Sequence, residues 1–220
     1  MFSDDTGIFQ LDLSGFETPN LVNMTGLFMD CSSLIRLQID KFTTKNVKDM
    51  SYLFHGCISL STIDVSKLDT SNVENMEEMF SQCSKVSKLD VGNFDTSKVT
   101  NMNSMFKQCV LLTSLDLSNF NTEKVTDMSH MFENLVLIKE LDVSKFKTSN
   151  VVDMNSMFSN NGAIGQLDVS KFDTSKVTNM MEMFNGLTQV QSLDVSKFDT
   201  SKVTDMSFMF KNCRKLTSLD

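Results

Sequence analysis

The sequence lacks most of the features that would assign an activity directly. It has no tryptophan, one tyrosine, one proline and eight glycines in 220 residues, and no glycine-rich loop that could hold a phosphate. No run of about 18 apolar residues occurs, so no transmembrane helix is expected. The acidic start, Met1 to Asp5, has no apolar segment of the kind found in signal peptides.

Positive charge is also scarce. Lysine and arginine total 20 against 28 aspartates and glutamates, which gives a formal net charge of −8. Binding to nucleic acid needs a basic stripe, and electrostatic docking on an anionic membrane needs a basic patch. We therefore expect neither nucleic acid nor a membrane surface as a partner.

The chain does contain one motif of 26 residues, repeated without a gap. Its opening residue, position 1, is Leu11, Leu37, Ile63, Leu89, Leu115, Leu141, Leu167, Leu193 and Leu219. A fixed period in this range is typical of solenoids, whose units bury their apolar faces only by stacking on their neighbours. We expect eight repeats, at 11–36, 37–62, 63–88, 89–114, 115–140, 141–166, 167–192 and 193–218. Residues 1–10 would start a first strand without a full cap, and residues 219–220 would start a ninth repeat.

Within a repeat, the pattern predicts a short strand, a loop and a short helix. Around Leu115, apolar and polar residues alternate as in a strand with one buried face. Position 13 is Asn or Asp in every copy, and such a residue suits the N-cap of a helix. The apolar residues that follow it at helical spacing in the fifth copy are Met128, Met131, Phe132 and Leu135. This predicts an α/β solenoid with a parallel sheet on its concave side and short helices on its convex side, curved because helices are wider than strands.

The residues also resemble a known family. Leu112-x-x-Leu115-x-Leu117 is similar to the opening of a leucine-rich repeat. The whole unit, with Phe-Asp-Thr-Ser-Lys-Val-Thr-Asn/Asp-Met-x-x-Met-Phe, resembles BspA-like leucine-rich-repeat surface proteins, especially the mycoplasma lipoprotein branch, over residues 8–220. The resemblance implies a right-handed stack of coils, a location at the cell surface or outside the cell, and a role in adhesion or host contact.

One position departs from ordinary leucine-rich repeats. Where those carry an asparagine that bonds from coil to coil, position 6 here is phenylalanine, or leucine in the case of Leu68. Threonine stands at position 8 in all eight copies, from Thr18 to Thr200. Because a buried hydroxyl can both donate and accept, we expect this threonine to supply the polar ladder along the stack.

Cysteines and histidines follow the repeat differently. Position 21 holds Cys31, Cys57, Cys83, Cys109 and Cys213, and otherwise Leu135, Asn161 and Leu187. This alternation predicts buried free thiols, although a bridge between stacked neighbours remains open. The two histidines occupy different registers, so no repeated catalytic or metal site is expected, nor any cofactor. Asn161 and two glycines in segment 159–165 predict that this return opens first.

The clearest surface feature is aspartate at position 2, predicted to point out of the concave sheet. This acidic column consists of Asp12, Asp64, Asp90, Asp116, Asp142, Asp168 and Asp194, interrupted by Gln38. Neighbouring charges about 4.8 Å apart repel by about 1 kcal/mol even in water. Lysine at position 5, or hydrogen bonds from the following turn, could hold the carboxylates in a purely structural role. Alternatively, the column binds a basic partner. Dedicated calcium sites are not expected, because single carboxylates in a line do not converge on one point.

These observations favour a non-enzymatic interaction module whose concave sheet binds a protein or extracellular-matrix ligand. The alternative is a structural spacer whose columns only solve the stacking problem, and an ice-binding surface built on threonine at position 12 is a third. Neither end carries a polar capping unit, so we also expect a segment of a longer array, or end-to-end stacking of copies.

Overall fold

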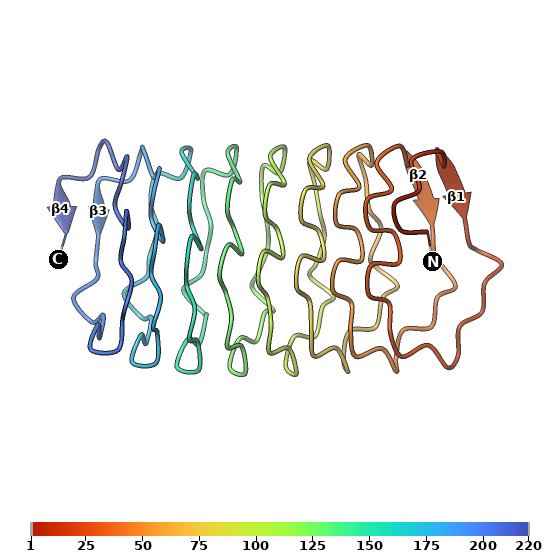
Figure 1. Ribbon diagram of the computed structural model, residues 1–220, viewed down its shortest axis with the longest axis horizontal. Coiled ribbons are helices and arrows are strands. Elements are labelled where there is room, and N and C mark those ends of the chain that lie inside the picture. Colours follow the sequence, from red (N-terminus) through yellow and green to blue (C-terminus); the bar gives the residue numbers. More distant parts are fainter. Residues whose placement is uncertain (1, 220) are drawn as a thin grey trace.

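Successive repeats lie side by side as the coils of one stack, with the two termini at opposite ends (Figure 1). The structure is a computed structural model that describes residues 2–219. We number the coils 1 to 8 after the repeats. The solenoid architecture predicted from the period is therefore present, and each coil contacts only its neighbours in the stack.

Within residues 2–219, the strands lie at the two ends of the array. Strand β1 (Gln10–Asp12) pairs in parallel with β2 (Arg36–Gln38), and β3 (Ser192–Leu193) pairs in parallel with β4 (Ser218–Leu219). Between them, the same segment of the repeat forms one isolated bridge, Glu140 to Gln166. The predicted parallel direction is confirmed, but the continuous sheet is not.

A second parallel ladder, only one residue wide, links all eight coils. Its bridges join position 13 of each coil to position 13 of the next, from Asn23–Asp49 through to Asn179–Asp205.

 The backbone N–H of Met24 donates to the carbonyl of Asp49 at 2.9 Å, and the same bond recurs from coil to coil. This ladder, which the sequence did not predict, ties the stack together where the terminal strands do not reach.

The predicted helices are wrong, since residues 2–219 contain no helix. In every copy, positions 16 and 20 have positive φ, as at His130 (56°) and Asn134 (62°). A right-handed helix cannot pass through left-handed residues. Backbone amides at positions 14, 16, 18 and 20 donate to the next coil, as Phe132 N–H does to the carbonyl of Met157 at 3.0 Å. The backbone amides at the positions in between close tight turns within the coil. For example, the N–H of Met131 donates to the carbonyl of Met128 at 3.2 Å.

Position 13 also begins a turn instead of a helix. The Oδ1 of Asp127 accepts the backbone N–H of Ser129, two residues later, at 2.8 Å. Because no helical layer widens one side of the coils, nothing holds them further apart on one face than on the other. In the view of Figure 1 the coils lie side by side along a straight line.

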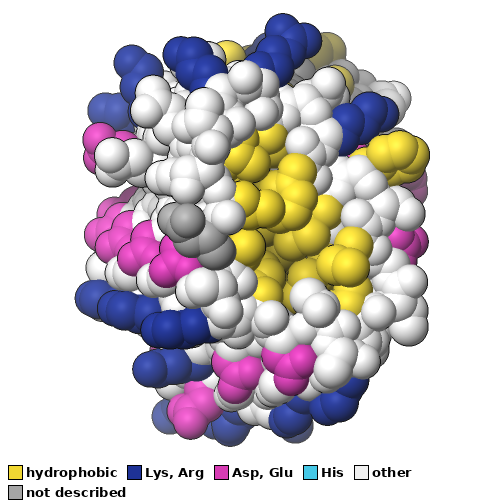
Figure 2. Space-filling model, turned by 90° about the vertical axis from the view of Figure 1, so that its left-hand side faces the viewer, with side chains coloured by type: hydrophobic (Ala, Val, Ile, Leu, Met, Phe, Trp, Pro, Cys, Tyr) yellow, Lys and Arg dark blue, Asp and Glu magenta, His cyan; other side chains and the backbone are white. Residues whose placement is uncertain are grey.

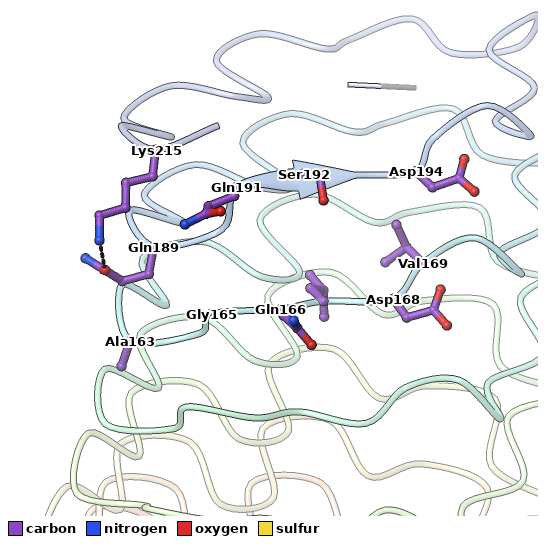
Figure 3. A pocket seen from close by; sticks show the side chains of 11 residues that line it. Ala163, Gly165, Gln166, Asp168, Val169, Gln189, Gln191, Ser192, Asp194 and Lys215 are labelled. Atoms are coloured by element: carbon purple, nitrogen blue, oxygen red, sulfur yellow. Dashed lines mark hydrogen bonds between the residues drawn. The ribbon is translucent and has the colours of Figure 1, made fainter. Parts of the chain in front are cut away.

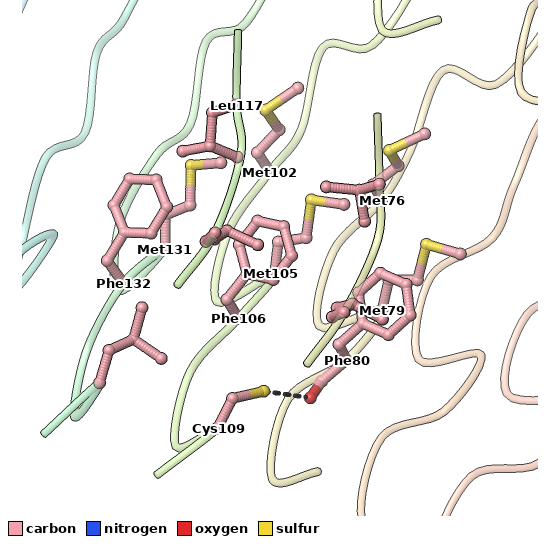
Figure 4. Close-up of a cluster of buried hydrophobic side chains, with 14 of the residues drawn as sticks. Met76, Met79, Phe80, Met102, Met105, Phe106, Cys109, Leu117, Met131 and Phe132 are labelled. Carbon is pink, nitrogen blue, oxygen red and sulfur yellow. Dashed lines mark hydrogen bonds between the residues drawn. The ribbon is translucent and has the colours of Figure 1, made fainter. Parts of the chain in front are cut away.

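The methionine and phenylalanine stripe faces inward as predicted, although it lies on turns. Phenylalanines at position 18 stack ring on ring through the whole array, with centroids of neighbouring rings 5.6–6.0 Å apart, and Phe2 extends the column at its start. Figure 4 shows Phe80, Phe106 and Phe132 in this column, with methionines beside each ring. Stacked aromatic rings at this spacing attract each other beyond the area that they bury.

The threonine ladder predicted at position 8 is confirmed. The hydroxyl of Thr122, which is 1% exposed, donates to the carbonyl of Lys147 in the next coil at 3.0 Å. The same oxygen accepts the backbone N–H of Lys147 at 2.7 Å. Thr44, Thr70 and Thr148 form the same pair of bonds to the next coil.

The five cysteines are free thiols, so the alternative of a bridge between coils is not realised. Each thiol donates to the carbonyl of a phenylalanine in the preceding coil, as Cys109 does to Phe80 at 3.0 Å (Figure 4). Burial raises the pKa of Cys109 to about 12, which keeps the thiol protonated. Asn161 replaces the thiol with a stronger connection: its amide donates to the carbonyl of Phe132 at 2.8 Å and accepts from Leu135 N–H at 2.7 Å. The fully buried Asn161 is thus satisfied, which removes one physical reason for expecting a weak return there.

Candidate functional site

All seven aspartates of the acidic column are exposed and lie at the same register of successive coils. Each stands between two residues that face inward, as Asp116 does between the buried Leu115 and Leu117. The side chains therefore point outward as predicted, on the side of the coil that carries β1 to β4.

Each carboxylate of the column is held by the turn that follows it. Its Oδ1 accepts the backbone N–H of the residue two positions later, at 2.9–3.0 Å in all seven cases. Within residues 2–219, none of the seven is ion-paired with the lysines at position 5. Of the two structural explanations, the turn hydrogen bond is therefore the one that the structure contains.

At Asp64, Asp168 and Asp194 these bonds lower the pKa and so favour the ionised carboxylate. The Ser170 and Ser196 hydroxyls, followed by the backbone N–H groups of the same serines, lower the pKa of Asp168 and Asp194. For Asp64 the backbone N–H of the following serine lowers the pKa most, with its hydroxyl next. Only one oxygen of each carboxylate is needed for the turn, so the other can accept a donor from a ligand.

Exposed positions beside this column differ between copies, as do positions 16 and 19 elsewhere on the coil. Position 25 is exposed in every copy, and it is Ile35, Ser61, Ser87, Thr113, Lys139, Gly165, Gln191 and Thr217. Position 26 is Arg36, Thr62, Lys88, Ser114, Glu140, Gln166, Ser192 and Ser218. We call positions 23, 25, 26 and 2 together the variable face. Core and ladder positions are nearly constant, so each coil has the same interior and a different exterior.

Three hollows lie on the variable face. One, of about 310 Å³, lies across coils 1 and 2 beside Asp12 and Arg36, and another, of about 510 Å³, lies across coils 4 to 6 beside Asp116 and Glu140. The largest has a volume of about 690 Å³ and is here called the recess. It is lined by Ala163, Gly165, Gln166, Leu167, Asp168, Val169, Gln189, Gln191, Ser192, Asp194 and Lys215.

Figure 3 shows how the recess is arranged. Asp168 and Asp194 lie at one end, on successive coils, with their carboxylates pointing the same way. At the other end, Lys215 donates to the side-chain oxygen of Gln189 at 2.6 Å. Asp168 and Asp194 were predicted as site residues from the sequence, whereas Gln166, Gln189 and Gln191 were not. Their signal was available, because glutamine at positions 23, 25 and 26 occurs only in these two neighbouring copies.

Each histidine pairs with a glutamate and with a side chain of another coil. His55 Nδ1 lies 2.8 Å from Glu78 Oε2 of the next coil, and the hydrogen bond with Glu78 raises the pKa of His55. His130 Nδ1 lies 2.7 Å from Glu133 Oε2, which Lys107 also contacts at 2.9 Å. Across residues 2–219 no group of three or more His, Cys, Asp or Glu side chains is placed to hold a metal ion.

The threonines at position 12 use their hydroxyls within the stack. Thr126 donates to the carbonyl of Thr100 at 3.1 Å, and Thr204 donates to that of Thr178 at 3.0 Å. These hydroxyls are therefore committed to coil-to-coil bonds, which weakens the ice-binding interpretation.

The face at the C-terminal end of the stack is apolar (Figure 2). In the last coil, Met206 and Phe208 are exposed. Among the described residues, no helix is long and apolar enough to cross a membrane.

Comparison with known proteins gives one family match. A family model described as "Mycoplasma protein of unknown function, DUF285" matches residues 1–89, 61–141 and 137–219. No curated protein matches the chain.

Two solved structures are similar to the chain. One is a leucine-rich repeat protein from Bacteroides ovatus, with 12% identity and a TM-score of 0.49, covering 96% of this chain and 45% of that one. The other is a leucine rich cell surface protein from Faecalibacterium prausnitzii, with 15% identity and a TM-score of 0.28, covering 96% of this chain and 78% of that one. The chain thus spans less than half the length of the first structure.

Proposed function

We propose that this chain, which belongs to the DUF285 family of Mycoplasma proteins of unknown function, is a non-enzymatic binding module. It binds a protein ligand through the variable face. The observation that carries the proposal is a nearly constant acidic column flanked by exposed positions that differ from coil to coil. Stacking requires a fixed interior and fixed ladders, and it requires nothing particular of the exposed side chains at positions 25 and 26.

The variable face has the chemistry of a binding surface. Its residues change from Ile35 and Arg36 in coil 1 to Lys139 and Glu140 in coil 5 and to Gly165 in coil 6, so each stretch offers a different pattern of charge and shape. The acidic column runs beside all of them and supplies a constant negative edge. Long-range attraction to a basic partner would speed association and orient it, while the varied residues would provide selectivity.

We further place this module at the cell surface, where its ligand would be a host protein or a matrix protein. This part of the proposal rests on the resemblance of the repeat to BspA-like surface proteins. The competing function, a structural spacer, is favoured by the turn hydrogen bonds that already occupy one oxygen of every column carboxylate.

Two variants of equal charge test the proposal. In the first, Asp64, Asp90, Asp116 and Asp142 of the column are changed to asparagine. Asparagine keeps the turn, because Asn23 and Asn75 accept the same i to i+2 bond at position 13. The control changes the aspartates at position 7, which form identical turns away from the variable face: Asp69, Asp95, Asp173 and Asp199.

The immobilised chain is then used to capture proteins from host-cell surface and matrix extracts over a series of salt concentrations. We expect the wild type and the control to retain the same proteins, less strongly at high salt, and the column variant to lose them. Failure of the wild type to retain any protein, or equal retention by both variants, would favour the spacer.

A further inference from the structure

We propose that the recess across coils 6 to 8 binds an extended peptide segment and holds a lysine or arginine side chain of that segment between Asp168 and Asp194. This inference rests on the proposed function and names the chemistry of the partner at one site.

The recess exists because small residues stand where other coils have side chains. A Cβ added to Gly165 would meet no atom within 4 Å, and the backbone there does not adopt the left-handed φ that favours glycine. Neither the fold nor the packing therefore requires glycine at position 25, where coil 5 has Lys139. The missing side chain leaves open space on the surface, and Ala163 does the same where coil 5 has Leu137.

The walls of the recess carry groups that suit a peptide backbone. Gln166 and Gln191 are exposed, and among the described residues their side-chain amides form no hydrogen bond to the protein. Each primary amide offers a donor and an acceptor, which matches the N–H and carbonyl of a peptide group. Ser192 adds a hydroxyl on the same side.

The charge at one end selects a cation. Asp168 and Asp194 lie one coil apart, and each uses its Oδ1 for the following serine. The charge of Asp194 acts against ionisation of Asp168, so a cation between them would relieve that repulsion. The lysine that lines the recess, Lys215, is bonded to Gln189 at the opposite end. A neutral oligosaccharide would hydrogen-bond to the amides but would not offer this positive charge.

The length of the recess fits a short extended chain. From Gln189 to Asp194 the coil runs five residues, which is about 16 Å at the rise of an extended chain. A peptide of five or six residues lying along the coil would therefore place one end near Lys215 and a basic side chain between the two aspartates.

An array of immobilised hexapeptides tests this directly, with neutral, acidic and lysine- or arginine-containing sequences beside neutral oligosaccharides. The purified chain is applied as wild type, as Gly165→Leu, which fills the recess, and as the double variant Asp168→Asn/Asp194→Asn. Gly15→Leu and Asp173→Asn/Asp199→Asn are the matched controls, because they make the same changes outside the recess and outside the variable face. A Cβ added to Gly15 also meets no atom within 4 Å, and Asp173 and Asp199 lie in the same coils as Asp168 and Asp194 and hold the same kind of turn.

We expect selective binding of lysine- or arginine-containing hexapeptides, lost in Gly165→Leu, weakened about tenfold in the double aspartate variant and unchanged in both controls. Circular dichroism of all variants should match the wild type. Binding without preference for basic peptides, preference for oligosaccharides, or equal losses in the controls would overturn the inference, even if host proteins are still captured. Selective peptide binding with no host protein captured would instead leave this site standing and overturn only the host-protein role.

Discussion

Replacing Thr122 by valine should destabilise the stack out of proportion to the single oxygen that it removes. Valine keeps the shape of threonine but leaves both the carbonyl and the N–H of Lys147 without the partner that now lies at 3.0 and 2.7 Å. Each unsatisfied group costs about 1–3 kcal/mol when buried. Since Lys147 is itself exposed and its backbone is partly accessible to water, we take the lower part of the range and expect a total loss of about 2–4 kcal/mol.

Serine at the same position separates hydrogen bonding from packing. Thr122→Ser keeps the hydroxyl and removes one methyl group, which should cost about 1 kcal/mol. Thr18→Val, in the first coil, should also cost less than the central substitution, because Thr18 is only partly buried and water can replace its hydroxyl.

The free energy of unfolding is measured by urea titration followed by circular dichroism, and amide exchange reports on the Lys147 N–H. We expect faster exchange at Lys147 in the valine variant only. If Thr122→Val loses no more stability than Thr122→Ser, the threonine column is not a polar ladder and the reasoning fails.

Three further predictions concern the core and the contacts between coils. Phe132→Ala should cost about 3–5 kcal/mol in urea unfolding, because the ring is fully buried and stacked on both sides; a loss below about 1 kcal/mol would contradict this. Asn161→Ala should cost about 2–4 kcal/mol, because it removes two buried hydrogen bonds and leaves a cavity, and unchanged amide exchange over 159–165 would refute it. Because Glu78 raises the pKa of His55, their pairing should stabilise the fold fully below the unfolded pKa of about 6.5 and weaken as pH rises through the folded pKa. Glu78→Gln should remove this pH dependence, which unfolding titrations on both sides of neutrality would measure.

The helix prediction shows where local pattern stops being informative. Spacing of three and four residues places Met128, Met131, Phe132 and Leu135 on one face whether the segment is a helix or a pair of turns. The difference lies in the partners of the backbone amides. A neighbouring coil supplies carbonyls to every second amide, and positive φ at His130 and Asn134 turns those amides toward it. That partner lies 25 residues away in sequence, so no local window contains it.

The acidic column and the threonine ladder were predictable because a solenoid converts register into position. A residue that recurs at one register must lie in a column, and its neighbours decide whether the column faces in or out. The orientation of Asp116 followed from the register and its apolar neighbours. The burial of Thr122 was expected because threonine recurs in every copy where the asparagine of ordinary leucine-rich repeats is missing. The sequence left two alternatives for what holds each aspartate, the lysine at position 5 or a hydrogen bond from the following turn. The structure contains the turn hydrogen bond.

The recess belongs to the tertiary structure. Gly165 and Gln166 come from coil 6, Gln189 and Gln191 from coil 7, and Asp194 and Lys215 from coil 8. By itself, the sequence determined the repeat, its register, the inward and outward positions and the coils in which the pattern breaks, because side-chain direction is a local and periodic property. The tertiary structure decided between helix and turn and gathered those breaks into one hollow, because hydrogen-bond partners and surface shape depend on what the adjacent coil presents.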